Sequence, residues 1–169
     1  MLGPLKEATP LLAVQHPTVQ LTDHTGALTT TVERTSPDHF FLNGTFESGA
    51  VLSYSLRGGQ AFDGASGTFW CIYGTKGAIQ ITGPDSFLQV AEDNFSIKLS
   101  KYGKEGVTEL HPDKDEWSGE QFSLYAKNVA RLYEAFAAGK TAEEGVLSWE
   151  DAVKRHAFVE EMYKKAGVQ

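Results

Sequence analysis

Apolar and polar residues alternate along the first two thirds of the chain, in the pattern expected of β-strands. In Val51–Arg57, the side chains of Leu52, Tyr54 and Leu56 point to one face and the residues between them point to the other. The same reasoning predicts further strands at Thr18–Thr22, Leu28–Thr35, His39–Phe46, Thr68–Tyr73, Ala78–Thr82, Phe87–Ala91, Phe95–Leu99 and Val107–Leu110. Because most of these segments follow one another across short turns, we expect a mainly antiparallel sheet.

Two tight hairpins define the centre of this predicted sheet, Ser36–Thr82. The first turns at Glu47–Ala50, which contains the glycine that a short hairpin needs, and the second turns at Gly74–Gly77. A glycine-rich loop, Gly58–Gly67, lies between the hairpins. In His39–Phe46, aromatic residues fall on both faces of the strand, which predicts a sheet at least partly covered on both sides.

The spacing of apolar residues becomes helical in the last third of the chain. Between Gln121 and Ala138 they recur every three or four positions, and Gly139 supplies a residue that tolerates the left-handed conformation at a helix end. A second helix is expected from Ser148 to near Gly167, with the Ser148 hydroxyl as its cap and Asp151 complementing its N-terminus.

Together these patterns predict an α+β fold, in which an open, mainly antiparallel β-sheet precedes two packed C-terminal helices. The length of 169 residues favours a single domain, residues 1–169. The formal net charge of −7 argues against binding to nucleic acid or to an anionic membrane. No apolar run approaches the roughly 20 residues of a membrane-spanning helix. One cysteine and no convincing signal peptide favour a cytoplasmic location.

Motifs for nucleotide or metal binding are not found in the sequence. It has neither a G-x-G-x-x-G motif nor a phosphate-binding loop, and its five histidines are dispersed. We therefore expect no cofactor and no metal. The substrate-binding candidates are polar or aromatic residues of the predicted sheet: His39, Phe41, Ser55, Arg57, Trp70 and Tyr73.

Arg57 is the most suggestive of these candidates. It is predicted to end a strand beside Gly58 and Gly59, where a guanidinium group could hold a carboxylate or another oxygen-rich ligand. The alternative is an ordinary surface arginine paired with one of the many acidic residues. Similarly, Trp70 is open to two interpretations, core packing or stacking on a ligand.

Several phrases of the sequence, in preserved order, resemble the C-terminal domain of Gfo/Idh/MocA oxidoreductases. They are SPDHFFLNGTFESGAVLSYSLRGG, FWCIYGTKGAIQITG, YAKNVARLYEAFAAGK and SWEDAVKRHAFVEEMYKKA. The nearest branch is the fungal one that includes the galactose/lactose metabolism regulatory protein, which the opening LLAVQHPTVQLTD also resembles. The resemblance covers almost the whole chain.

This resemblance implies a domain whose sheet supplies substrate contacts and often forms an oligomer interface. In the family, a separate N-terminal Rossmann domain binds NAD(P), and that domain is missing from this sequence together with its glycine-rich loop and Glu-Lys-Pro segment. By this resemblance, we also expect the chain to begin after the first strand and helix of the C-terminal domain, and that helix carries the branch's Gly-His-x-x-Asp-type motif. No catalytic residue is therefore carried over to this chain.

Three hypotheses follow. The first is a cofactor-free protein that binds a small molecule or associates with itself, as a homodimer formed through the sheet. The second is a repurposed, non-redox cyclase or isomerase of a fungal biosynthetic pathway. The third is a fragment or subunit of an NAD(P)-dependent oxidoreductase.

Overall fold

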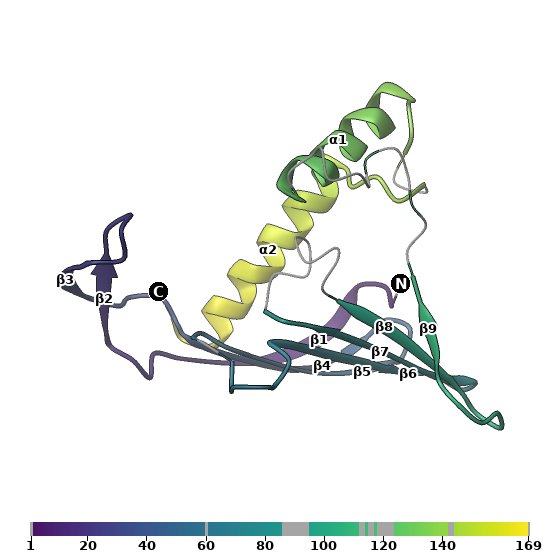
Figure 1. Cartoon of the computed structure of the whole chain (residues 1–169), viewed down its shortest axis with the longest axis horizontal. Coiled ribbons are helices and arrows are strands. Elements are labelled where there is room, and N and C mark those ends of the chain that lie inside the picture. The colour runs from purple at the N-terminus through teal and green to yellow at the C-terminus, as the bar shows by residue number, and fades with distance from the viewer. Residues whose placement is uncertain are drawn as a thin grey trace. The chain divides into compact units, whose positions relative to one another are not determined.

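The computed structural model describes residues 2–59, 61–85, 95–111, 114, 117, 124–141 and 144–168. These residues form β1 (Leu5–Ala13), β2 (Thr18–Thr22), β3 (Leu28–Glu33), β4 (His39–Phe46), β5 (Val51–Arg57), β6 (Thr68–Tyr73), β7 (Gly77–Gly83), β8 (Ser96–Lys101), β9 (Thr108–Leu110), α1 (Leu124–Ala137) and α2 (Trp149–Lys165) (Figure 1). The chain divides into two compact units, Met1–Gly59 with Ser148–Gln169, and Gln60–Leu147. The single-domain assignment stays a prediction.

The first unit contains a three-stranded antiparallel sheet in the order β1-β4-β5, and a separate hairpin of β2 and β3. In the sheet, Phe41 lies opposite Leu11 on one side and Ser55 on the other. Gly44 allows β1 and β4 to approach closely, because a Cβ atom at this position would overlap the carbonyl oxygen of Glu7.

Helix α2 begins with the predicted cap. The amide of Asp151 donates to Ser148 Oγ at 3.1 Å, and the amide of Ser148 donates to the Asp151 carboxylate at 3.0 Å, which completes a capping box. The helix lies against β1. Leu42 on β4 and Met162 on α2 are the buried apolar side chains among the described residues.

Exposed side chains occur on both faces of this sheet. Phe41 and Leu11 on one face are 40% and 59% exposed, and Tyr54 and Leu56 on the other face are each 43% exposed. The expectation that both sides of the sheet are at least partly covered stays a prediction.

The second unit contains a four-stranded antiparallel sheet in the order β6-β7-β8-β9. Its two faces have different compositions. Cross-strand pairing places six aliphatic side chains and one tryptophan on the same face. They are Trp70, Ile72, Ile79, Ile81, Ile97, Leu99 and Leu110. Phe69, Cys71 and Tyr73 point to the other face, where their neighbours on β7 are Thr82, Gln80 and Ala78.

The predicted α+β class is confirmed: antiparallel sheets precede two C-terminal helices. Gly139 follows α1 with a φ of +68°, as predicted for a helix end. The strand predicted at Phe87–Ala91 and the first residues of the helix predicted from Gln121 lie outside the described residues. Within the described part of the chain, neither helix has the length and apolar character needed to cross a lipid bilayer.

Candidate binding site at the end of the first sheet

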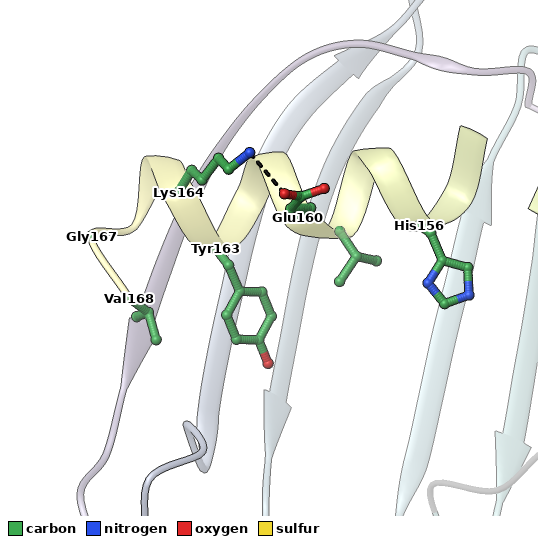
Figure 2. Close-up of a pocket in the computed structure, with 7 residues that line it drawn as sticks. His156, Glu160, Tyr163, Lys164, Gly167 and Val168 are labelled. Atoms are coloured by element: carbon green, nitrogen blue, oxygen red, sulfur yellow. Dashed lines mark ion pairs between the residues drawn. The ribbon is translucent and has the colours of Figure 1, made fainter. Parts of the chain in front are cut away.

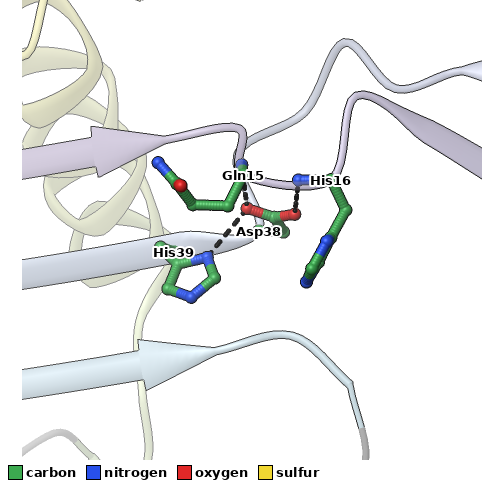
Figure 3. A network of polar contacts seen from close by, with 4 residues as sticks. All are labelled: Gln15, His16, Asp38 and His39. Atoms are coloured by element: carbon green, nitrogen blue, oxygen red, sulfur yellow. Dashed lines mark hydrogen bonds and ion pairs between the residues drawn. The ribbon is translucent and has the colours of Figure 1, made fainter.

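The carboxylate of Asp38 organises the end of the β1-β4-β5 sheet. It accepts hydrogen bonds from the backbone amides of Gln15 and His16, each at 2.8 Å (Figure 3). The Asp38 backbone makes two more bonds, donating to the Ala13 carbonyl at 3.0 Å and accepting from the Gly58 amide at 2.6 Å. One buried residue therefore joins the end of β1, the start of β4 and the end of β5.

His39 adds a third contact to the same carboxylate, with 2.9 Å between its Nδ1 and Asp38 Oδ1. This hydrogen bond, followed by those from Gln15 and His16, holds the pKa of Asp38 well below its usual range and outweighs the opposing effect of burial. An ionised carboxylate can only accept hydrogen bonds, so Nδ1 of His39 carries the proton. The Nε2 atom of His39 is then left for a contact outside this network.

Three rings form a row beside Asp38. The His16 and His39 ring centroids are 6.3 Å apart, and Figure 3 shows both rings extending to the same side of Asp38. Phe41 stacks next to His39 with a centroid distance of 6.4 Å and an interplanar angle of 27°. Arg57 lies directly opposite His39 on β5, so the two side chains share one face of the sheet.

The structure thus brings together four of the six predicted site residues. His39 and Phe41 on β4 pair with Arg57 and Ser55 on β5. Trp70 and Tyr73 belong to the second unit, and they point to opposite faces of β6.

Tyr73 has a polar neighbourhood of its own. A hydrogen bond with the Cys71 side chain is the main cause that raises the pKa of Tyr73, with smaller contributions from the Cys71 charge, from partial burial and from Tyr102. The amide of Gln80 also lies 3.9 Å from Cys71 Sγ. Cys71 is therefore in contact with polar groups on this face and is only partly buried.

Asp38 and His16 are site residues that the sequence analysis missed. Asp38 contacts residues 22 and 23 positions away along the chain, so no local motif marks it. Only the pairing of β1 with β4 brings these groups together, and β1 was not among the predicted strands.

A groove of about 740 Å³ runs along α2 and its C-terminal end (Figure 2). It is lined by His156, Val159, Glu160, Tyr163, Lys164, Gly167 and Val168. An ion pair of 2.8 Å joins Glu160 to Lys164 in this groove. The lining residues include none of the predicted site residues. Among the residues that the structure describes, no group of three or more His, Cys, Asp or Glu side chains is placed to hold a metal ion.

Known proteins match the first half of the chain in sequence and nearly all of the chain in fold. Residues 1–83 match the family model of the Gal80p C-terminal domain. This match confirms the predicted resemblance to the Gal80p-like branch of the Gfo/Idh/MocA C-terminal domain. No curated protein sequence matches the chain.

Solved structures of Gal80p have the same fold. A super-repressor mutant of Gal80p from Saccharomyces cerevisiae aligns with a TM-score of 0.76 and 21% identity over 98% of this chain. The transcriptional regulator Gal80p from Kluyveromyces lactis aligns with a TM-score of 0.76 and 20% identity, also over 98% of this chain. The chain spans 43% and 41% of the lengths of these two Gal80p chains.

Proposed function

We propose that this chain is a cofactor-free binding domain that associates with a second copy of itself through the Phe69–Tyr73 face of the β6-β7-β8-β9 sheet. The observation that carries the proposal is the exposure of two aromatic side chains on that face, 66% for Phe69 and 77% for Tyr73. Aromatic residues are enriched in the cores of protein interfaces and, above all Trp and Tyr, among the few residues that contribute most of the binding energy. A second copy would remove these side chains from water.

The similarity to Gal80p supports binding as the function. The Kluyveromyces lactis Gal80p is described as a transcriptional regulator, and a regulator acts through its contacts. Applied to this chain, the comparison favours a sheet used as a binding surface over a sheet used in redox chemistry.

The size of the face predicts a weak dimer. Strands of six residues are about 20 Å long, and three to four strands spaced by about 4.8 Å span roughly 15–19 Å. The flat area is therefore about 300–400 Å², whereas a stable interface buries about 800 Å² on each partner. We expect a dissociation constant in the micromolar range or weaker, unless other surfaces of the chain contribute.

Sedimentation-velocity centrifugation over a concentration series tests the proposal. The wild-type chain is expected to pass from monomer to dimer as its concentration rises through the micromolar range. Phe69→Glu places a charge on the proposed interface and is expected to leave the chain monomeric throughout the series. Phe62→Glu is the matched control, because Phe62 is 82% exposed in the loop of the same unit and lies outside the sheet.

Two results would overturn the proposal. One is a wild-type chain that stays monomeric at the highest concentration. The other is a dimer that Phe69→Glu and Phe62→Glu weaken equally, since self-association would then not depend on the sheet face.

A second candidate function is a non-redox cyclase or isomerase. The observation that favours it is the contact between Asp38 and His39, because a carboxylate that holds Nδ1 of a histidine leaves Nε2 to act as a base. The test is to replace His39 by glutamine in the producing organism and compare its metabolites with those of the parent. An unchanged metabolite profile would exclude this role.

The remaining alternative is a segment of an NAD(P)-dependent oxidoreductase. We propose that the chain by itself binds neither NAD⁺ nor NADP⁺, because it matches the C-terminal domain of Gal80p. Isothermal titration with each dinucleotide measures this directly, and saturable heat with either one would contradict the cofactor-free assignment.

A further inference from the structure

We propose that the groove along α2 binds a small, uncharged aromatic molecule that carries a hydroxyl group, as a phenol or a naphthol does. The volume of the groove, about 740 Å³, lies within the range of about 300–1,000 Å³ that is typical of small-molecule sites. Its lining residues belong to α2 and to the chain directly after it, in the first unit (Figure 2). The site therefore does not depend on the proposed dimer face, which belongs to the second unit.

The helical repeat brings the lining side chains together. His156 and Tyr163 are seven positions apart, or almost two full turns, so their rings lie on the same side of α2, about 10 Å apart along its axis (Figure 2). Val159 is three residues from one ring and four from the other, which places it on the same side. Val168 adds an apolar side chain at the C-terminal end. The groove thus combines apolar side chains with two rings that each carry a hydrogen-bonding group.

The polar atoms of both rings are available to a ligand. His156 is exposed and Tyr163 is partly buried, and within the described part of the chain neither side chain has a hydrogen bond or an ion pair. A neutral imidazole has one donor and one acceptor nitrogen, and a phenolic hydroxyl can both donate and accept. Each ring can therefore pair with a hydroxyl group of a ligand whose apolar body lies against Val159.

The charges of the groove favour an uncharged ligand. Glu160 and Lys164 neutralise one another in an ion pair of 2.8 Å, and Lys165 in the same last turn is paired with Glu161, also at 2.8 Å. The groove reaches the C-terminus of α2, and the partial negative charge of a helix C-terminus disfavours an anion. A cation would have to compete with Lys164 for Glu160. An aromatic alcohol avoids both costs.

The binding is expected to be weak. Val159 is 51% exposed, so the groove encloses a ligand only in part, and we expect a dissociation constant of roughly 0.1–1 mM. 2-Naphthol is a suitable probe, because its fused rings supply apolar surface and its hydroxyl supplies the hydrogen bond. The experiment is set at about pH 8, where an ordinary imidazole is neutral.

Histidine side-chain NMR gives a direct measurement, because the chain carries its own internal controls. The full chain is titrated with 2-naphthol up to about 3 mM, the range of weak ligand binding. Saturable shifts are expected for the ring signals of His156. The ring signals of His16, His24, His39 and His111 are expected to stay unchanged.

Two comparison probes test the chemical class of the ligand. Phenol keeps the hydroxyl and has one ring fewer, so it is expected to bind at least about 10-fold more weakly than 2-naphthol, since several carbon atoms are no longer removed from water. 2-Naphthoate keeps both rings and adds a negative charge, so it is expected to bind at least about 2-fold more weakly because of the helix C-terminus.

Two valines of α2 provide a matched pair of variants. Val159 lines the groove and Val153 does not, yet they are similarly exposed, at 51% and 54%. Val159→Ala is expected to weaken 2-naphthol binding about 3-fold or more, because it removes two methyl groups that contact the ligand, whereas Val153→Ala leaves the affinity unchanged. His156→Phe keeps a ring and removes its nitrogen atoms, and the loss of one hydrogen bond is expected to weaken binding about 3- to 10-fold, measured by ligand-observed NMR.

The proposal is overturned by any of four results. The first is no saturable shift at His156, and the second is an equal shift at all five histidines, which indicates non-specific binding. The third is the same 2-naphthol affinity in Val159→Ala and Val153→Ala, with both variants folded by circular dichroism. The fourth is a 2-naphthoate affinity equal to or higher than that of 2-naphthol, since the ligand would then not be uncharged.

Discussion

Replacing Met162 by alanine tests how firmly α2 is held on the sheet that carries the candidate site. Met162 is 1% exposed and comes from the one helix of the first unit. Truncation of a fully buried methionine costs the transfer free energy of the lost atoms and leaves a cavity, together about 2–5 kcal/mol. The better helix propensity of alanine offsets this loss of stability by only about a few tenths of a kcal/mol.

For a chain of this length, each 1 kcal/mol lowers the melting temperature by about 2–4 °C, so a fall of roughly 4–20 °C is expected. The direct assay is urea unfolding followed by far-ultraviolet circular dichroism. The free energy of unfolding is compared between the wild type and the variant at unchanged slope, because a changed slope would indicate that the two units unfold separately.

Val159→Ala is the matched control. It shortens another apolar side chain of α2, but Val159 is 51% exposed, so the free energy of unfolding is expected to change by less than about 0.5 kcal/mol. If Met162→Ala and Val159→Ala had the same effect, α2 would not be packed on the sheet as described.

Two further predictions concern the sheet itself. Because the pKa of Asp38 is lowered in the folded chain, its contribution to stability is present above the ordinary carboxylate pKa of about 3.9 and is lost as the pH falls below it. When urea unfolding is measured from pH 7 to pH 3, the free energy of unfolding should therefore fall more steeply with pH for the wild type than for Asp38→Asn. Asp63→Asn is the control, and an equal dependence on pH in the wild type and Asp38→Asn would contradict the prediction. Gly44→Ala should lower the free energy of unfolding by about 1–3 kcal/mol, because its Cβ would overlap the Glu7 carbonyl oxygen and force β1 away. Gly74→Ala meets its nearest atom at 3.4 Å and should cost less, and thermal melts that rank the two glycines in the opposite order would exclude this account.

Much of the secondary structure could be predicted from the sequence because it depends on local interactions. Alternation of side chains determines which residues of β4, β5, β6 and β7 share a face, and the observed pairing follows it. The hairpin between β4 and β5 turns at Gly49, whose φ of +83° suits glycine. The Ser148 cap is equally local, since its partner Asp151 is three residues away.

The strand β1 was not predicted, and its absence from the prediction hid the site. Pro10 interrupts the alternation in this segment and removes one backbone donor, which normally argues against a strand. The structure accommodates it because β1 is at the edge of its three-stranded sheet. Because β1 was not predicted, nothing in the sequence indicated that Gln15 and His16 lie beside Asp38.

The sequence by itself determined the described elements other than β1, the faces of their side chains and the kind of residues available for binding. The tertiary structure decided which of those residues meet. It joined His39, Phe41, Ser55 and Arg57 through the pairing of β4 with β5 and added His16 and Asp38, while Trp70 and Tyr73 fell on opposite faces of another sheet. The physical reason is that a side chain's face is set by its neighbours in the chain, whereas its contacts are set by strand pairing across many residues.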